Sequence, residues 1–407
     1  MSEKCNSRHF SWLMKSCFPN NQQSHQPCPF TTSISTTLSS LPDDLLLECL
    51  CRVPNSTLPV LSLVCHRWAL LLDSPSFHHL RLNHHLITLT IFSISISNSS
   101  IFAASHHLLP TYSSWKISSF SPKHQAILES GSFYSPFSSP RLASIGRKIY
   151  IIGRSAMLQC DSWTGTVTQM PGTLIPRKKF AAAAVAGKLY VAGGCPRSVA
   201  VEEFDPEMNT WRVVCDAPKK RYGCIGASID GVLYVIGGLR VGTAADEARV
   251  EGPPHVYAST MDLYDVEGNV WLRSRSVPTG GCVVAATAAA GHIYILSSHA
   301  VDLSFWKFNA SRKCPRFGEW DRIKTPPLAG QVRLDSTVRF SCIGVGEKVV
   351  LVQVMGCIDD ILRRSGRAER GFKEGLVLVY DCAAGEWSRG VDMPEVIRRP
   401  TCVCVEC

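Results

Sequence analysis

The sequence lacks an unbroken apolar run of the roughly 20 residues that a membrane-spanning helix needs. Residues 86–104 come nearest, but Ser and Asn recur among their apolar residues, a pattern that suits strands and turns. A secretory signal, with a basic start followed by an apolar segment, is also missing. The N-terminal residues are rich in Ser, Asn, Gln and Pro, so we expect residues 1–39 to be a disordered tail. The sequence therefore argues against secretion and against a membrane partner.

Motifs for catalysis and for nucleic-acid binding are absent as well. The histidines do not show the His-Glu-x-x-His spacing of a catalytic zinc site, and no Gly-x-Ser-x-Gly elbow occurs. The Gly-Gly pairs that begin at Gly193 and Gly237 are not followed by Lys-Ser/Thr, which favours turn glycines over phosphate loops. The net charge of +9 is spread along the chain, without a clustered basic helix. We therefore expect neither an enzyme nor a nucleic-acid-binding protein, and no cofactor.

Cysteine is abundant, with 18 residues, but its pattern is not that of a disulfide-rich secreted protein. Most cysteines stand singly inside apolar runs, where a thiol behaves as a small hydrophobic side chain. Cys402, Cys404 and Cys407 could be read as part of a zinc site, but no second Cys/His pair accompanies them, so no metal site is expected. This usage fits a reducing compartment, either the cytoplasm or the nucleus or both.

Residues 41–80 have the spacing of short amphipathic helices. Pro42 lies at an early helical position, where its missing N–H costs little, and Asp43 and Asp44 follow in the first turn, where carboxylates suit the helix dipole. Ser74-Pro75 begins another helix. Three short helices in about forty residues can hardly bury a core alone, so we expect another protein to cover their apolar surface. The apolar positions at helical spacing are Leu46, Cys49, Leu50, Val53, Leu58, Leu61, Val64, Cys65 and Trp68.

This segment resembles the F-box in its ordered motifs. The Leu-Pro opening, the Val-Cys followed by a basic residue and Trp, and the closing Ser-Pro-x-Phe are present at residues 41–42, 64–68 and 74–77. The resemblance implies docking on the small Skp adaptor of SCF-type cullin-RING ubiquitin ligases. The adaptor-binding residues that it implies are Leu41, Pro42, Leu45, Leu46, Leu50, Leu61, Val64, Cys65 and Trp68. The alternative is an ordinary helical subdomain whose leucines pack only on the rest of the chain.

An internal repeat follows the helices. Each unit has a Gly followed by Leu/Ile-Tyr-Val/Ile, as at residues 187–191, 231–235 and 291–295 and, with one extra residue, at 146–150. Downstream, an aromatic-Asp pair precedes a Trp, and a Pro follows the Trp after seven residues. The Trp-to-Pro interval holds at Trp115, Trp211, Trp271, Trp320 and Trp387, which chance would not maintain.

These features resemble the kelch repeat, a four-stranded propeller blade with a Gly-Gly pair, a Tyr and a Trp at these relative positions. Paired glycines permit a turn where side chains would clash, and the aromatic rings fill the gaps between blades. A period of roughly fifty residues gives about six blades, some of them degenerate. The expected fold class is mainly β, a kelch β-propeller preceded by a small three-helix F-box. Five blades with a disordered segment at 86–135 remain an alternative.

We expect a tail at residues 1–39, the F-box at 40–82 and the propeller at 83–407. The first blade lacks a first strand, because the F-box runs almost directly into residues 86–90, whereas an alternating run at 400–406 is left over after the last blade. We therefore expect residues 400–406 to fill that vacancy and close the ring. The clearest repeats span residues 140–176, 177–221, 222–281, 282–336 and 337–399.

Target recognition is expected on the loops of one propeller face. In an up-and-down blade, the loops between second and third strands emerge on the same side as the blade-to-blade connections, and two of these loops, at 239–260 and 356–375, are long. Basic residues gather there, which suits an acidic or phosphorylated patch on a target. The candidates are Arg177, Lys178, Lys179, Lys219, Lys220, Arg221, Arg363, Arg364, Arg398 and Arg399. The alternative is that these charges only keep the ring soluble.

The layout is similar to that of plant F-box/kelch proteins of the Skp-interacting-partner type. It predicts the substrate-recognition subunit of an SCF-type ligase, in which the F-box binds the Skp adaptor and, through it, the cullin-RING scaffold. The propeller would bind a target protein, and a separate E2 enzyme would transfer ubiquitin. The alternative is a kelch-repeat interaction scaffold without ligase activity. A kelch-type copper oxidase is a third reading, which the shortage of histidine inside the repeats disfavours.

Overall fold

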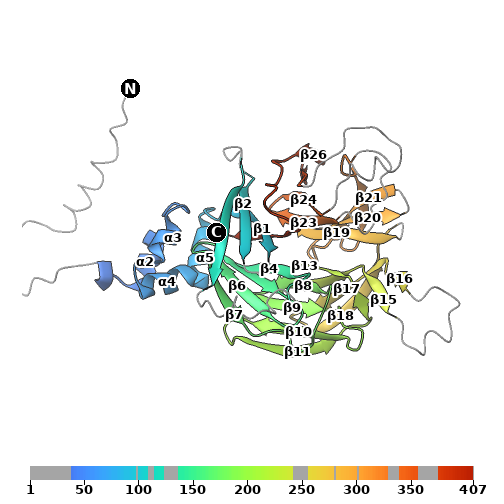
Figure 1. Cartoon of the computed structure of the whole chain (residues 1–407), viewed down its shortest axis with the longest axis horizontal. Coiled ribbons are helices and arrows are strands. Elements are labelled where there is room, and N and C mark those ends of the chain that lie inside the picture. Colours follow the sequence, from blue (N-terminus) through green and yellow to red (C-terminus); the bar gives the residue numbers. More distant parts are fainter. Residues whose placement is uncertain are drawn as a thin grey trace, which may run out of the picture. The chain divides into compact units, whose positions relative to one another are not determined.

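The structure of the chain is a computed structural model (Figure 1). It describes residues 38–97, 100–108, 114–122, 136–241, 255–278, 281–299, 302–328, 339–355 and 375–406. The expected tail, apart from residues 38 and 39, and nearly all of the loop expected at 356–375 lie outside the described residues. The chain divides into two compact units, Met1–Leu46 and Leu47–Cys407.

The helical region consists of short helices separated by turns. The 3-10 helix η1 (Leu38–Ser40) precedes α2 (Asp43–Leu50), which has Asp43 and Asp44 in its first turn. The apolar positions expected on one helix from Leu58 to Trp68 are divided between two helices, α3 (Leu58–Leu61) and α4 (His66–Asp73), because the backbone of Cys65 between them is extended. Ser74 caps α5 (Pro75–Asn83) by accepting a hydrogen bond from the Phe77 N–H at 3.2 Å. None of the described helices is long and apolar enough to cross a bilayer.

Six four-stranded blades follow in the described part of the chain, with one additional small sheet (Figure 1). Blade 1 is β27 (Thr401–Glu406), β1 (Leu89–Ile96), β2 (Ile101–His107) and β3 (Lys116–Pro122); blade 2 is β4 (Arg141–Ile145), β5 (Lys148–Ile152), β6 (Met157–Asp161) and β7 (Thr166–Met170); blade 3 is β8 (Ala181–Val185), β9 (Lys188–Ala192), β10 (Ala200–Asp205) and β11 (Thr210–Asp216). Blade 4 is β13 (Ile225–Ile229), β14 (Val232–Ile236), β17 (Thr260–Asp265) and β18 (Val270–Ser276); blade 5 is β19 (Cys282–Ala289), β20 (His292–His299), β21 (Asp302–Asn309) and β22 (Trp320–Ile323); blade 6 is β23 (Arg339–Val345), β24 (Lys348–Met355), β25 (Val377–Asp381) and β26 (Glu386–Arg389). The small sheet pairs β12 (Arg221–Tyr222), β15 (Leu239–Val241) and β16 (His255–Tyr257).

The inner strands of the blades form a closed ring. Neighbouring inner strands contact one another in the order β27, β4, β8, β13, β19 and β23, and β23 contacts β27 again. The strands β1, β2 and β3, from the part of the sequence with the weakest repeat, form a blade together with β27. The propeller therefore has six blades, as the repeat period predicted, and the five-blade alternative is excluded.

The pairing of β27 with β1 completes blade 1. It is antiparallel and runs from Leu89 opposite Glu406 to Ile94 opposite Thr401. Val405 on this strand is fully buried. The two ends of the propeller sequence thus meet in one blade, and an open sheet edge becomes part of a continuous ladder.

Blades 1 and 2 are joined into one eight-stranded sheet. Their outer strands β3 and β7 pair in parallel, with Ser121 opposite Thr166. Because successive strands within both blades are antiparallel, the inner strands β27 and β4 run in the same direction. The other blades repeat this order, so all inner strands begin at the same end of the ring.

The aromatic residues of the repeat meet between neighbouring blades. The ring of Tyr150 in blade 2 lies edge-on to that of Phe204 in blade 3, with centroids 6.1 Å apart. Tyr234 of blade 4 and Phe308 of blade 5 make the corresponding contact at 6.3 Å. Edge-on aromatic pairs add stability beyond the burial of their surface. The spacing seen in the sequence therefore places these rings where adjacent blades pack.

A repeat glycine allows the next blade to approach closely. Gly237 has a φ of 64°, in the left-handed region that side chains disfavour. A Cβ atom at this position would lie 2.7 Å from the Val283 side chain in blade 5. A larger residue would therefore push blades 4 and 5 apart.

Trp163 attaches the F-box helices to blade 2. It lies in the turn after β6, and its ring packs against an apolar cluster of the helices that contains Leu50, Leu72 and Phe77. The Arg147 guanidinium lies 4.4 Å from the centre of this ring, and its Nε donates to Asp73 of α4 at 2.6 Å. Blade 2 lacks a Trp at the usual repeat position, and its Trp serves this attachment instead.

The connection from α5 into blade 1 is held by polar contacts. Buried Arg81 donates hydrogen bonds to the carbonyl oxygens of Cys51 at 2.8 Å and Leu86 at 2.6 Å. His78 on α5 pairs with Glu406 on β27 at 3.3 Å. The hydrogen bond between His78 and Glu406 raises the pKa of His78 and lowers the pKa of Glu406. The helices are thus tied both to the first strand of the propeller sequence and to its last.

Deleting residues 401–407 is expected to open the ring. The deletion removes the partner of β1 and exposes the apolar surface that β27 now covers. It also removes Val405, a fully buried side chain of a kind whose burial stabilises the fold by about 1.5–3 kcal/mol. We expect a strongly lowered Tm and aggregation, measured by circular dichroism and light scattering. Deleting Cys407 alone leaves β27 intact and is the control. A deletion variant that melts like the wild type would contradict the role of β27.

Replacing Trp163 with Ala is expected to loosen the helices while sparing the blades. The ring is only partly buried, so we expect a loss of about 1–3 kcal/mol in the attachment. Limited proteolysis between residues 80 and 89 should become several-fold faster, with the Tm of the propeller little changed. Trp163→Phe keeps an aromatic ring and should behave like the wild type. Equal cleavage rates for the Ala variant and the wild type would show that the contact is incidental.

Candidate adaptor- and target-binding surfaces

Two of the residues implied as adaptor contacts are buried. Leu46 and Leu50 expose only 1% and 4% of their surface. Leu50 belongs to the apolar cluster against which Leu61 and Trp68 also pack, and both of these are partly buried. We therefore correct the assignment of Leu46 and Leu50, which are interior residues of this fold and do not present a surface to a partner.

The remaining implied residues are open to solvent. Pro42, Leu45, Val64 and Cys65 are exposed, and Leu41 is partly exposed. Leu45 and Val64, with 50% and 58% of their surface exposed, are the most exposed large apolar side chains among them. These five residues stay candidates for adaptor contact.

The structure adds three apolar residues that the sequence reasoning did not single out. Val60, Leu63 and Leu70 each have more than half of their surface exposed, and Leu63 reaches 74%. The signal was present in the sequence, because residues 58–64 hold more apolar side chains than one helical face can bury. Leu58 takes the buried position and leaves Val60 and Leu63 outside.

Arg177 was predicted to contact a target, and this prediction is wrong. Its side chain is completely buried and pairs with Glu202, which is also buried, at 2.6 Å. Its guanidinium donates to the carbonyl oxygens of Gly193 at 2.8 Å and Ala200 at 2.6 Å. Arg177 therefore joins the entry of blade 3 to its second and third strands.

Arg221 repeats this arrangement in blade 4, and its predicted target contact is also wrong. It is buried, pairs with Asp262 at 2.8 Å and donates to the Gly237 carbonyl at 2.9 Å. Burial opposes ionisation of Asp262, but the neighbouring Arg221 holds the pKa of this carboxyl below its usual range. In both blades the Arg lies sixteen residues before the Gly whose carbonyl it binds, a spacing that could have been read from the sequence.

The other predicted target-binding residues are distributed as follows. Lys178, Arg398 and Arg399 are exposed, and Lys179 and Lys220 are partly exposed. Lys219 is partly exposed and lies 3.5 Å from the Asp262 carboxylate. Arg363 and Arg364 lie outside the described residues.

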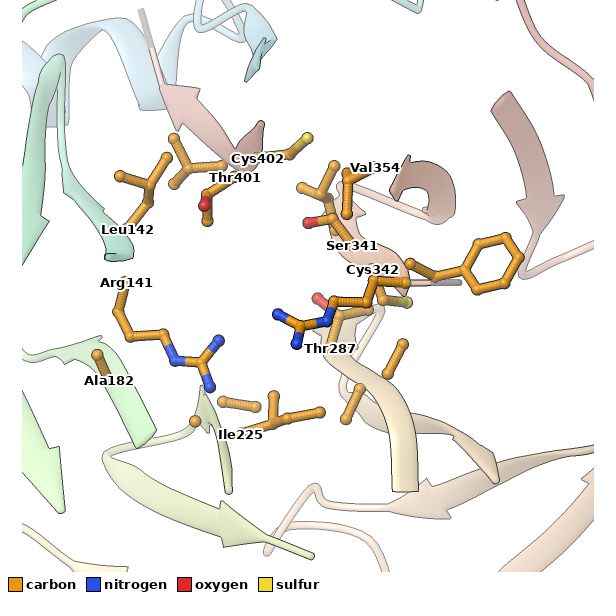
Figure 2. A pocket seen from close by; sticks show the side chains of 18 of the residues that line it. Arg141, Leu142, Ala182, Ile225, Thr287, Ser341, Cys342, Val354, Thr401 and Cys402 are labelled. Atoms are coloured by element: carbon orange, nitrogen blue, oxygen red, sulfur yellow. The ribbon is translucent and has the colours of Figure 1, made fainter. Parts of the chain in front are cut away.

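A cavity of about 1220 Å³ lies where the inner strands meet (Figure 2). Four basic residues from the starts of inner strands line it: Arg141 begins β4, Lys179 precedes β8, Arg339 begins β23 and Arg399 precedes β27. Figure 2 shows the Arg141 side chain extending into the cavity. Sequence reasoning found Lys179 and Arg399 but missed the other two, although each opens an apolar strand.

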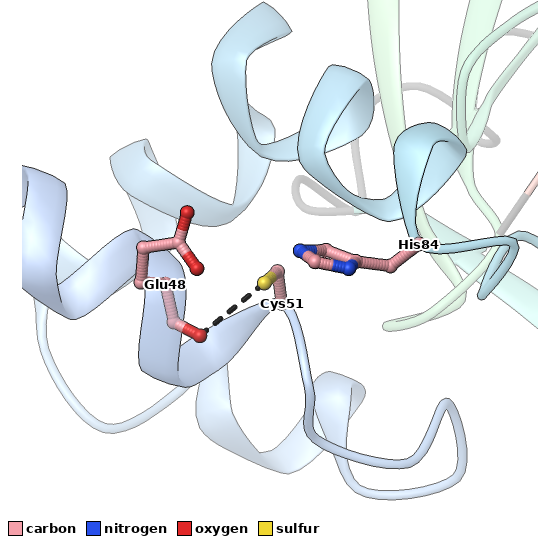
Figure 3. Close-up of side chains that lie close together, drawn as sticks. All are labelled: Glu48, Cys51 and His84. Atoms are coloured by element: carbon pink, nitrogen blue, oxygen red, sulfur yellow. Dashed lines mark hydrogen bonds between the residues drawn. The ribbon is translucent and has the colours of Figure 1, made fainter.

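The F-box region contains one group of side chains that could hold a metal ion, among the residues that the structure describes. Among the described residues, potential ligand atoms of Glu48, Cys51 and His84 lie within 4.8 Å of one another (Figure 3). The Cys51 thiol donates to the Glu48 carbonyl oxygen at 3.3 Å, and burial raises the pKa of this thiol. Glu48 also pairs with Arg52. A thiol that retains its proton is a poor ligand, so we do not assign a metal to this group.

Replacing Arg177 with Ala is expected to destabilise the propeller without acting on a binding surface. The change leaves the Glu202 carboxylate buried without its partner, which costs about 3–5 kcal/mol. Lys178→Ala removes a neighbouring exposed charge and should change stability by about 0.5 kcal/mol or less. Urea unfolding of both variants measures the difference. Equal stabilities would contradict the structural role of Arg177.

Comparison with known proteins agrees with this architecture. The family model described as F-box domain matches residues 38–80, and the one described as Kelch motif matches residues 176–214. F-box/kelch-repeat protein At5g26960 of Arabidopsis thaliana is 54% identical over 417 residues, which covers 100% of both chains. F-box/kelch-repeat protein At2g22030 of the same plant is 33% identical over 276 residues, 61% of this chain and 66% of the relative. With its helical module, its kelch propeller and this full-length similarity, the chain belongs to the F-box/kelch-repeat proteins.

Proposed function

We propose that this protein is the substrate-recognition subunit of an SCF-type E3 ubiquitin ligase. The F-box domain implies binding to an Skp-type adaptor, which links it to the cullin-RING scaffold, and the propeller holds the target for ubiquitination. The observation that carries the proposal is the set of exposed apolar residues Val60, Leu63, Val64 and Leu70, on α3, the turn after it and α4, beside a buried apolar cluster of the helices that packs against Trp163 of blade 2. Covering such side chains contributes about 1.5–3 kcal/mol each when burial is complete.

The chemistry of ubiquitin transfer is assigned to an E2 enzyme on the scaffold. F-box/kelch proteins are typically non-catalytic adaptors. The attachment through Trp163 and Arg147 supports this role, because it holds the propeller in a fixed relation to α4 and α5. A bound target would then be presented in one orientation.

The target surface is the propeller face with the blade-to-blade connections. Lys178, Lys220 and Arg398 lie there and stay candidates, whereas Arg177 and Arg221 do not. We place the protein in the cytoplasm, the nucleus or both, a proposal supported by unpaired and buried cysteines such as Cys160 and Cys224. The alternative function is a kelch interaction scaffold without ligase activity, which would not need the exposed apolar surface of the helices.

Capture of the Skp adaptor distinguishes these two functions. Replacing both Leu63 and Val64 with Glu places two carboxylates in the docking surface, where the pair should together cost at least about 2 kcal/mol, so adaptor affinity should fall roughly 30-fold or more. Affinity is measured by biolayer interferometry with the purified adaptor. The matched control is Val213→Glu with Val270→Glu, which changes two exposed valines on the outer strands β11 and β18. Wild-type protein that fails to bind the adaptor would favour the scaffold.

A further inference from the structure

One end of the propeller channel carries a basic arc. Because all inner strands begin at the same end, Arg141, Lys179, Arg339 and Arg399 gather at that end of the cavity. They come from blades 2, 3, 6 and 1, whose inner strands are neighbours around the ring. The charges therefore occupy one continuous side of the channel mouth.

No carboxylate balances these charges within the described lining. The lining residues include neither Asp nor Glu, and none of the four cations forms an ion pair with a described acidic residue. Burial lowers the pKa of Lys179, and the nearby charges of Arg339, Lys178 and Arg141 lower it further. Burial also lowers the pKa of Arg141. The mouth thus holds like charges that repel one another, and an anion would relieve this repulsion.

The orientation of Arg141 is fixed by the backbone around it. Its Nε donates to the Phe180 carbonyl at 2.7 Å and its Nη2 to the Cys224 carbonyl at 3.2 Å. An arginine has five N–H donors, so these two bonds leave others for a ligand in the cavity, into which the side chain extends (Figure 2). A guanidinium that is held in place loses little conformational entropy when it binds a carboxylate or a phosphate.

The opposite end of the channel is neutral. The hydroxyls of Ser144 and Ser228 lie near the ends of β4 and β13 and donate to the carbonyls of Cys404 at 2.6 Å and Ala184 at 2.7 Å. These bonds link adjacent inner strands and leave no charge at that end of the described lining. An anionic ligand would therefore be drawn to the basic end alone.

We propose that this basic arc binds an acidic or phosphorylated side chain of the target protein, with the target segment entering the channel mouth. The inference rests on the proposed receptor function and deepens it by naming the recognised chemistry. The cavity, at about 1220 Å³, exceeds the roughly 300–1,000 Å³ of ordinary small-molecule sites. The side of the mouth without Lys or Arg includes Gly223, where a Cβ atom would meet no other atom within 4 Å, and this leaves room for a peptide backbone. A compact free polyanion would be better matched by cations on all sides.

The test uses full-length protein and three pools of degenerate 12-residue peptides. The pools differ only in a fixed central residue, which is phosphoserine, Glu or Ser, and recovery is quantified by mass spectrometry. We expect the wild type to recover the phosphoserine or Glu pool about tenfold better than the Ser pool, the effect of one charge-assisted hydrogen bond. Arg339→Glu combined with Arg399→Glu should remove this preference. Both side chains are exposed, so the fold should persist.

The matched control is Arg273→Glu combined with Lys313→Glu, two exposed cations outside the cavity lining that give the same change in net charge. It should keep the wild-type preference, and the milder pair Arg339→Gln with Arg399→Gln should lose most of it. Equal recovery of all pools by the wild type, or an unchanged preference in the Arg339/Arg399 variants, would overturn the inference. Binding of sodium pyrophosphate without recovery of any anionic pool would overturn a peptide occupant. Adaptor capture, recorded on the same preparations, reports separately on the receptor function.

Discussion

The antiparallel pairing of β27 with β1 is the contact on which the rest of the propeller depends. A blade can bury both of its faces only against two neighbours, so six blades in a closed ring share six interfaces, whereas an open chain of blades would leave two faces uncovered. The same strand supplies Glu406 to the F-box helices and part of the channel wall through Cys404. Closure of the ring, attachment of the helices and the shape of the channel therefore all depend on the pairing of β27 with β1.

The fold class could be predicted from the sequence because its signals are local and repeated. The Tyr and Trp positions recur at fixed intervals, and residues such as Tyr150 and Phe204 occupy equivalent places between blades. The weak first repeat could not settle the number of blades by itself, since β1 to β3 carry few of the repeat residues. The repeat pattern could not show which departures from it have a structural role. Trp163 looked like a departure from the pattern, and its partners are residues of the helices about a hundred positions earlier in the chain.

The candidate site was harder to predict because the role of a charge depends on its partners. Arg177 and Arg399 are both basic residues at blade connections, yet one is enclosed with Glu202 and the other faces a cavity. Glu202 is twenty-five residues away from Arg177 and is brought to it by the course of β10. For the helices, periodicity identified which residues are apolar but not which of them face outward. Leu50 and Leu63 are both leucines in apolar stretches, but Leu50 is buried and Leu63 is exposed.

The eight-stranded sheet of blades 1 and 2 has a consequence for how such a protein can diversify. The contacts that attach the helices come from this sheet, through Arg147 and Trp163 in blade 2 and Glu406 in blade 1. The parallel pairing of β3 with β7 makes these two blades one continuous support. Blades 3 to 6 can therefore accumulate substitutions and loop insertions without disturbing the contacts that attach the helices. Duplicated copies of the gene could acquire new specificities in two thirds of the ring while inheriting an unchanged attachment.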